Sequence, residues 1–567
     1  MGLIMDRMKR LGPALAILAF LALFFTANRG AYQSAFSDDD IDNIAWTRRS
    51  LTSDFATGLL SPRYYPNHFR PVGHFTFSVL AKTAGMRFRP YVAVIHLLHL
   101  VNTVLLWLLL RRLGLPGWHA GAGTLFFSFN MALFDAVWKP MYLFDLWCAL
   151  FCLATLILYI DGRILLAILT FLLAYKSKEH AVAIPAVLLA YEWTLGKVDW
   201  KKIAPFAAIA MWFAAQGVLM NKEAGRDYSL HFTPAALYAT ASFYGPRAFT
   251  IPVLLLLPWV RTRRVLFGLA TTLLLLGPML FLPTRLSGAY LYVAMLGLAI
   301  SVGSALAALP WAASALFFAA WIPMNYQTMR EERRAALTTA HENGAYLAAV
   351  AELSKQAPGL HRFIYDGHPP GMRWWGISGA LRIFYDRPDI QLFPIEEKDP
   401  KELFEQGDVA LLRWNNPLRR LSVAKRAAGE PPASFIRMDD ATPVWQLGEG
   451  WYQSEGKFRW IKPRATARLH RPADAREFAV EVNIGPKYIA DVKRAKLTVM
   501  LDGERLGVAE FDSPGWATVR FPISGAPPRD GAAQIEFIAS PGYGPSKLDS
   551  RILGIPIGSF GFQKTTP

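Results

Sequence analysis

Cysteine is almost absent from this sequence. The 567 residues contain two, Cys148 and Cys152, which lie four positions apart inside an apolar run. A helix would hold both on one face in apolar surroundings, so neither a disulfide nor a thiolate metal site fits them. The sequence also lacks an HExxH motif, a P-loop, internal repeats and low-complexity tracts. We therefore predict no metal site and no cofactor, and leave a requirement for a divalent ion open.

Acidic residues are the second shortage. The sequence has 43 acidic and 60 basic residues, and 53% of its residues are hydrophobic. A net charge of +17 could indicate nucleic acid binding. However, many of the cations lie in short loops between apolar runs instead of on one continuous face. The composition predicts a membrane protein, and no nucleic acid partner is expected.

Long apolar runs fill residues 11 to about 325. Because a helix needs about 20 apolar residues to cross the hydrocarbon, we count eleven candidate spans. They are 11–27, 91–110, 118–137, 142–160, 163–176, 181–195, 204–220, 234–259, 265–282, 289–308 and 311–325.

Basic residues predict the orientation of these spans. Cations precede the first span and recur in alternate loops, near residues 111–112, 163, 197–202 and 261–264. Since Lys and Arg stay on the cytoplasmic side, the N-terminus is predicted to be cytoplasmic. The first outer loop (28–90) and everything after residue 325 would then be exported. The first span is predicted to be an uncleaved anchor, because many spans follow it.

The remaining sequence has the alternation of a soluble protein. Residues 326–430 combine a helix pattern with the strand-like runs "RFIYD" and "VALLRW", which predicts an exported α/β segment. Residues 431–567 contain alternating segments separated by turns, with a hairpin signal at Asp502-Gly503, which favours a β-sandwich. Trp451 and Trp460 in this part could stack on sugars or fill the core, and we favour the core. The fold prediction is thus a mainly α, polytopic helical bundle in residues 1–325, followed by these two exported parts.

The stretch "AFSDDDIDNIAW" (35–46) places Asp38, Asp39 and Asp40 directly after the first span. Ser37 could be a helix N-cap, with the acids in the first turn where they complement the dipole. This interpretation explains one or two of the acids. So dense a cluster at the edge of a membrane also suits a catalytic carboxylate, and both interpretations remain open.

Two further stretches carry charge at the predicted outer face. "SPRYYPNHFRPVGHF" (61–75) sets Arg70 and His74 among aromatic residues such as Tyr64 and Tyr65, which suits a phosphorylated sugar. An amphipathic interfacial segment is the alternative.

"YKSKEHAVAIP" (175–185) interrupts two apolar runs with Lys178 and Glu179. Ionisable groups at membrane depth face a wet cavity or each other, although a charged hairpin in water is the alternative. Arg247 and Arg285 lie near later outer ends, while His99 and Asn102 are spaced to hydrogen-bond between helices.

These stretches resemble the GT-C class of multi-span glycosyltransferases that use polyprenyl-phosphate sugars, notably bacterial relatives of the protein O-mannosyltransferases. The resemblance covers about residues 10–325. It is carried by "FSDDD" (36–40), "FRPV" (69–72), "HLLHLVNTVLLWLLLRRLG" (96–114) and "YKSKEHAVAIPAVLLAYEW" (175–193). The similarity is weaker in "FYGPRAF" (243–249) and "LPTRLSGAYLYVAMLGLA" (282–299).

The resemblance implies a glycosyltransferase that moves a sugar from a polyprenyl-phosphate donor to an acceptor hydroxyl on the outer face of a bacterial inner membrane. An aspartate of the first loop would be the base; we favour Asp39, followed by Asp40 and Asp38. The acceptor could be a glycan, a lipid or a protein. The alternatives are a transporter or flippase of lipid-linked glycans and a non-catalytic glycan-binding protein of the cell envelope. The residues expected to bind the donor phosphate and sugar are Lys178, Glu179, Arg70, His74, Arg247 and Arg285.

Overall fold

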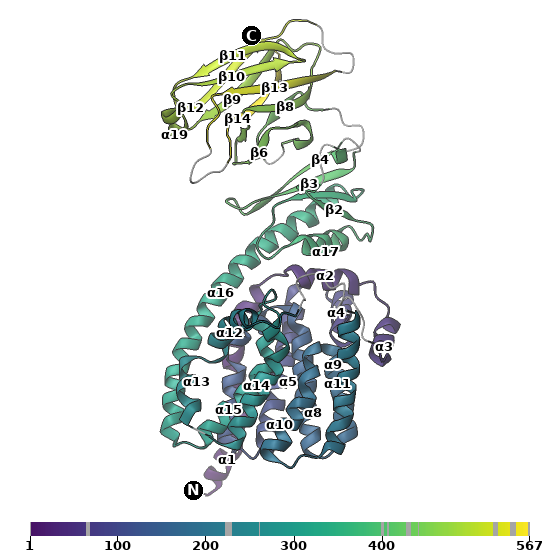
Figure 1. Cartoon of the computed structure of the whole chain (residues 1–567), viewed down its shortest axis with the longest axis vertical. Helices are drawn as coiled ribbons and strands as arrows, with labels where there is room; N and C mark the ends of the chain where they lie inside the picture. Colours follow the sequence, from purple (N-terminus) through teal and green to yellow (C-terminus); the bar gives the residue numbers. More distant parts are fainter. Residues whose placement is uncertain are drawn as a thin grey trace. The chain divides into compact units, whose positions relative to one another are not determined.

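The computed structural model describes residues 2–63, 69–220, 230–259, 261–397, 402–404, 407–426, 432–439, 442–525, 531–544 and 551–564. The chain divides into two compact units, Met1–Gly344 and Ala345–Pro567. The first unit is helical and the second is rich in strands (Figure 1).

The first unit is a bundle of apolar helices with three short helices at one end (Figure 1). The short helices α2 (Asp38–Thr47), α3 (Thr52–Leu60) and α4 (Pro71–Thr83) lie in the first predicted outer loop. The other helices are α1 (Gly2–Asn28), α5 (Phe88–Arg112), α6 (Gly117–Ser128), α7 (Phe134–Trp138), α8 (Leu143–Ile160), α9 (Ile164–Ser177), α10 (Ile184–Leu195), α11 (Trp200–Met220), α12 (Pro234–Ala248), α13 (Ile251–Leu256), α14 (Arg263–Leu276), α15 (Leu291–Ala307) and α16 (Trp311–Gln356).

Several of these helices are long and apolar enough to cross a membrane, so the chain is a multi-pass membrane protein. In the described part of the chain five elements qualify, and the bent pair α6 and α7 makes a sixth if it counts as one span. The prediction of eleven spans stays a prediction. The five are Ala14–Gln33, Phe88–Arg112, Pro140–Ile160, Arg263–Phe281 and Gly288–Ala307.

Close packing of α14 on α15 sets the centre of the bundle. Every residue of α15 from Leu291 to Leu306 is buried. A Cβ added to Gly297 would lie 2.5 Å from the carbonyl oxygen of Gly268 and 2.5 Å from the amide nitrogen of Thr272. Small residues let two helix backbones approach in this way, as is common between membrane helices.

Polar groups inside the bundle pair between helices, as the sequence predicted. His99 lies with Nδ1 2.8 Å from the Tyr292 hydroxyl, and Asn102 donates to the Leu146 carbonyl at 2.9 Å. Both side chains are fully buried. Cys148 and Cys152 are buried free thiols, which confirms that they form no disulfide.

Helix α16 runs without a break through the predicted domain limit at residue 325, with Pro323 inside it. The second unit then contains a four-stranded sheet with the order β2-β1-β3-β4, in which β1 pairs in parallel with both β2 and β3. The runs "RFIYD" and "VALLRW" are strands, as predicted. The elements are β1 (Arg362–Asp366), α17 (Trp374–Phe384), β2 (Gln391–Pro394), β3 (Val409–Asn415) and β4 (Arg420–Arg426).

Two antiparallel sheets follow, with the orders β11-β10-β13-β8 and β12-β9-β14-β7-β6, and they share one apolar core. Asp502 and Gly503 join β10 to β11 with φ of 51° and 87°, which confirms the predicted hairpin. Trp451 and Trp460 pack against this core. The strands are β5 (Phe435–Arg437), β6 (Trp451–Ser454), β7 (Arg459–Ile461), β8 (Arg464–His470), β9 (Glu477–Ile484), β10 (Ala495–Leu501), β11 (Glu504–Phe511), β12 (Gly515–Pro522), β13 (Ala532–Ser540) and β14 (Pro556–Gln563).

The contact between α14 and α15 predicts the effect of a larger residue at Gly297. Gly297→Val should lower the free energy of unfolding by at least about 1–3 kcal/mol, because the new side chain meets backbone atoms that cannot move aside. Thermal unfolding of the purified protein in detergent measures this. Gly121→Val in α6 is the matched control, since a Cβ there meets nothing within 4 Å. Equal melting temperatures for the two variants would contradict the close approach.

Candidate functional site

A buried ion pair between Lys178 and Asp145 lies at the centre of the candidate site. The Lys178 Nζ atom is 2.7 and 2.6 Å from the two carboxylate oxygens of Asp145. Lys178 is extended (φ −163°, ψ 148°), so it ends α9 and begins the 3-10 helix η4 (Glu179–Ala183). The ring of Tyr290 covers Nζ at 4.7 Å. The two side chains are 7% and 0% exposed, so each charge depends on the other.

Arg70 and Glu179 form a second ion pair. Glu179 directly follows Lys178 in the chain, so the two pairs are neighbours. The Arg70 Nε and Nη2 atoms donate to the Glu179 carboxylate, with Nη2 2.9 Å from Oε2. Arg70 is the N-cap of α4, where the following Pro71 favours the start of a helix. Its guanidinium lies 5.4 Å from the centre of the Phe144 ring. The fork of Arg70 is thus held in one orientation by a carboxylate and an aromatic ring.

His74 connects this pair to the helix that carries the aspartates. The Arg70 amide donates to His74 Nδ1 at 2.9 Å, and His74 Nε2 lies 3.0 Å from Asn43 Oδ1 on α2. Since Nδ1 accepts, Nε2 carries the proton and the ring is neutral. Trp46 and Phe69 enclose the ring, and His74 is 4% exposed. His74 therefore positions α2 against Arg70.

The three aspartates of α2 have different surroundings. Ser37 is the N-cap, and its amide donates to Asp40 Oδ2 at 2.9 Å in a capping box. The helix-cap interpretation is thus confirmed for Asp40, which is fully buried. Asp39 is exposed and Asp38 is half-buried. Burial raises the pKa of Asp40 to about 7, although its hydrogen bonds with Ser37 act in the opposite direction.

The two later arginines have different surroundings in the fold. Arg285 lies close enough to Tyr290 to interact with it electrostatically, and Tyr290 covers Lys178. Arg247 instead packs on Phe243 and lines a cavity of about 1060 Å³. The sequence-predicted residues Arg70, His74, Lys178 and Glu179 therefore form one group of contacts, with Arg285 beside it and Arg247 in the cavity.

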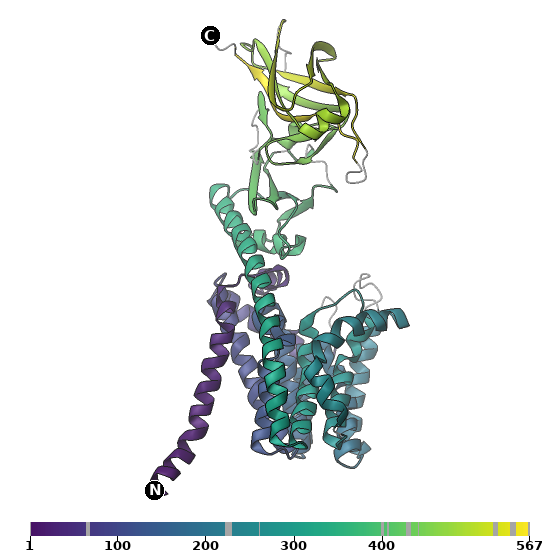
Figure 2. The ribbon, with the colours of Figure 1, turned by 90° about the vertical axis from the view of Figure 1, so that its left-hand side faces the viewer.

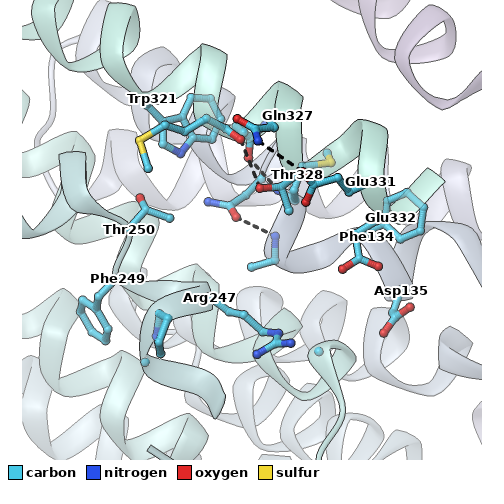
Figure 3. Close-up of a pocket in the computed structure, with 18 of the residues that line it drawn as sticks. Phe134, Asp135, Arg247, Phe249, Thr250, Trp321, Gln327, Thr328, Glu331 and Glu332 are labelled. Atoms are coloured by element: carbon cyan, nitrogen blue, oxygen red, sulfur yellow. Dashed lines mark hydrogen bonds between the residues drawn. The ribbon is translucent and has the colours of Figure 1, made fainter. Parts of the chain in front are cut away.

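This cavity contains charges of both signs. Arg247 of α12 and Asp135 of α7 both lie in it (Figure 3), and Asp135 is ion-paired with Lys139 at 2.6 Å. Residues of α16, including Glu331, form the opposite wall (Figure 3). Gly288 lines the cavity and begins the 3-10 helix η9 (Gly288–Tyr290), whose last residue covers Lys178. The cavity thus adjoins the ion pairs.

Sequence reasoning missed three parts of the site. Asp145 is an acid at the start of an apolar run, a pattern that predicts a partner but not which one. Asn43 had no signal of its own, and Tyr290 lies in the run 282–299 that the resemblance includes, but its contact with Lys178 depends on the fold. Tyr64 and Tyr65, which the sequence suggested as sugar-facing rings, lie outside the described residues. Among the residues that are described, no group of three or more His, Cys, Asp or Glu side chains could hold a metal ion.

No protein-family model matches the sequence, and no curated protein is similar to it. Three solved structures are similar in chain arrangement. ArnT from Cupriavidus metallidurans bound to undecaprenyl phosphate is 13% identical, with 71% of this chain and 93% of that chain covered and a TM-score of 0.46. The arabinofuranosyltransferase AftD from Mycobacteria is 11% identical, with 96% of this chain and 61% of that chain covered and a TM-score of 0.41. The arabinosyltransferase EmbB from Mycobacterium smegmatis is 14% identical, with 96% of this chain and 64% of that chain covered and a TM-score of 0.31.

AftD and EmbB are named as sugar transferases, and ArnT is bound to a polyprenyl phosphate, in line with the class that the sequence motifs resemble. At these identities and TM-scores the likeness carries no argument about the donor, the acceptor or any residue. The roles of the site residues rest on the geometry described above.

The pair of Lys178 and Asp145 predicts non-additive stability changes. Removing one partner should cost about 3–5 kcal/mol, because the other charge is left buried and unpaired. We expect Lys178→Met and Asp145→Asn each to lower the melting temperature strongly. The double variant should lose much less stability than the sum of the two single losses, because neither charge is then left unpaired. Lys202→Met is the control, since Lys202 pairs with Asp199 at the surface. Additive losses would contradict the pairing.

The surroundings of Asp40 predict a dependence of stability on pH. Because its pKa in the folded protein, about 7, lies above the ordinary value of 3.8, the stabilising contribution is complete below the ordinary value and is lost as pH rises through about 7. The melting temperature of the wild-type chain should therefore fall as the pH rises from the ordinary value of 3.8 to about 7, and Asp40→Asn should reduce that fall. Asp54→Asn is the matched control, since Asp54 has the same capping position in α3 but is exposed. An unchanged pH dependence in Asp40→Asn would contradict this account.

Proposed function

We propose that this chain is a membrane glycosyltransferase that moves a sugar from a polyprenyl phosphate to an acceptor hydroxyl, with inversion at the anomeric carbon. The observation that carries the proposal is the group of oriented ion pairs at the ends of apolar helices, joined through His74 to the helix of the aspartates. Cations held there, next to hydrocarbon, suit a ligand whose phosphate is attached to a lipid.

Lys178 and Arg70 would bind the donor phosphate. Among the described residues, Glu179 occupies only Nε and Nη2 of Arg70, so Nη1 can donate to a phosphate oxygen. Lys178 has three N–H groups, and Asp145 accepts two close contacts from them. Arg285 would add positive charge beside Tyr290, and Arg247 would face the part of the substrate in the cavity. Such fixed donors stabilise the charge that grows on the departing phosphate.

An aspartate of α2 would be the general base. The acceptor oxygen attacks the anomeric carbon, its proton passes to the carboxylate, and the bond from that carbon to the phosphate oxygen breaks. Polyprenyl phosphate leaves with the bonding electron pair. Asp39 is best placed because it is exposed, whereas the capping box occupies Asp40. Asp40 and Asp38 are the alternatives.

The proposal includes an orientation in the membrane. Arg112 and Asp161 form an ion pair at 2.8 Å, so the C-terminal ends of α5 and α8 meet. These ends and the basic loops 197–202 and 261–264 would face the cytoplasm. The aspartates and the strand-rich unit would then face outward, where the donor enters sideways from the bilayer and the acceptor arrives from water.

Replacement of the proposed base should abolish transfer without unfolding the chain. With purified protein and a labelled polyprenyl-phosphate sugar, Asp39→Asn should lower the rate by about 10²–10⁴-fold. Asp42→Asn, in the same helix but outside the trio, is the control and should retain activity. Full activity in the Asp38, Asp39 and Asp40 single and triple Asn variants would dismiss the base. Movement of the labelled lipid across a bilayer without release of polyprenyl phosphate would instead indicate a transporter.

A further inference from the structure

A second groove lies between α1 and α16, away from the ion pairs. It has a volume of about 780 Å³, and its walls also include the segment between α6 and α7. Apolar side chains such as Leu23 and Ile322 line most of it, and both are exposed. Figure 2 shows α1 standing apart from the rest of the bundle, and α1 is the least buried of the five possible spans. The groove is therefore open to the lipid around α1.

Four arginines line one end of this groove: Arg29 of η1 (Arg29–Gln33), and Arg330, Arg333 and Arg334 of α16. The last three share one face of α16, because residues three and four apart are neighbours on a helix. Arg333 reaches across to η1, since a Cβ on Gly30 would lie 2.9 Å from its Nε. Within the part of the chain that the structure describes, none of the four forms an ion pair or a side-chain hydrogen bond.

Charges of opposite sign are separated on α16. Glu331 and Glu332 lie between these arginines in the sequence, yet both line the other cavity (Figure 3). The arginine end of the groove is therefore uniformly positive. Four guanidinium groups around one groove create a positive potential that attracts an anion.

The position of these arginines in the membrane also calls for an anion. Arg29 ends the first apolar run, and Arg330 follows the apolar start of α16, at the end of the bundle that carries α2. Long basic side chains at the ends of apolar helices reach the headgroup level of a bilayer. Four of them around one groove therefore lie where the phosphates of lipids lie.

We propose that the groove between α1 and α16 binds an anionic glycerophospholipid, with its phosphate on the arginines and its acyl chains against the apolar wall. The charge of the groove selects an anion, and guanidinium forks bind phosphate oxygens bidentately. A soluble phosphate would leave the apolar wall uncovered. Because the groove opens beside α1, its occupant comes from the bulk lipid there, of which only the anionic members complement arginine.

A bound lipid would support the wall that this groove shares with the larger cavity. Asn325 of α16 lines both spaces. It accepts from the Met131 amide at 2.9 Å and donates to the Phe129 carbonyl at 2.7 Å, which fixes the break between α6 and α7. The binding proposal stands independently of the glycosyltransferase proposal, since it concerns a different surface and needs no turnover.

Binding is measured by native mass spectrometry of the full chain, released from nanodiscs that contain equal amounts of phosphatidylglycerol and phosphatidylcholine. The wild-type chain should retain phosphatidylglycerol. The triple variant Arg330→Gln, Arg333→Gln, Arg334→Gln should bind it at least about tenfold more weakly. The matched control is Arg261→Gln, Arg263→Gln, Arg264→Gln, which removes three arginines from the opposite end and should bind like the wild type. Equal loss in both variants, or retention of phosphatidylcholine equal to that of phosphatidylglycerol, would overturn the proposal.

A second measurement covers the case in which the triple variant does not fold. Phosphatidylglycerol with a photoreactive acyl chain should label the unmodified chain at Leu23 or Ile322. Labelling confined to other helices would overturn the proposal. Displacement of the labelled lipid by an equimolar amount of polyprenyl phosphate would also overturn it, because the groove would then be a site for the donor or its product.

Discussion

The need to neutralise charge at the ends of apolar helices governs the candidate site. Lys178 is buried at the end of α9, where hydrocarbon and packed side chains replace water. The carboxylate of Asp145, with the ring of Tyr290, makes that position tolerable. Because Glu179 follows directly, the same turn of chain also holds Arg70. Two ion pairs from one short break in a helix thus fix α4 and, through His74, α2.

The polar contacts at this end contrast with the apolar contacts at the centre of the bundle. α14 and α15 meet through glycine, with no side chain between their backbones. The ion pairs of the candidate site lie around η4 and η9, beside the larger cavity. In the proposed reaction a phosphate there would meet donors that are already oriented, so little reorganisation would be needed when charge develops.

Much of the fold could be predicted from the sequence, because periodicity reports burial. The apolar runs are helices, the alternating runs of the second unit are strands, and Asp502-Gly503 is a hairpin turn. The limit at residue 325 was less visible, since Pro323 lies in a helix that continues to Gln356. Hydropathy changes at that point because the surroundings change, whereas the backbone conformation does not.

Several charged residues of the candidate site could be noticed in the sequence, but their pairing could not. Lys178 and Arg70 stand out as charges beside apolar runs, but only the fold shows that Asp145 and Glu179 are their partners. Asp40 illustrates the same limit. Three consecutive aspartates look equivalent in a sequence, whereas helical rotation exposes Asp39 and buries Asp40 in its own cap. Rotation about a helix axis is set by packing, which no local pattern encodes.

His74 can make both of its hydrogen bonds, to the Arg70 amide and to Asn43, only while its ring is uncharged. Its Nδ1 atom must accept the Arg70 amide while Nε2 faces Asn43. An imidazolium has two donors and no acceptor. A proton on Nδ1 would therefore break the hydrogen bond from the Arg70 amide at the start of α4. Protonation of this one enclosed ring would thereby weaken the link between α2 and Arg70.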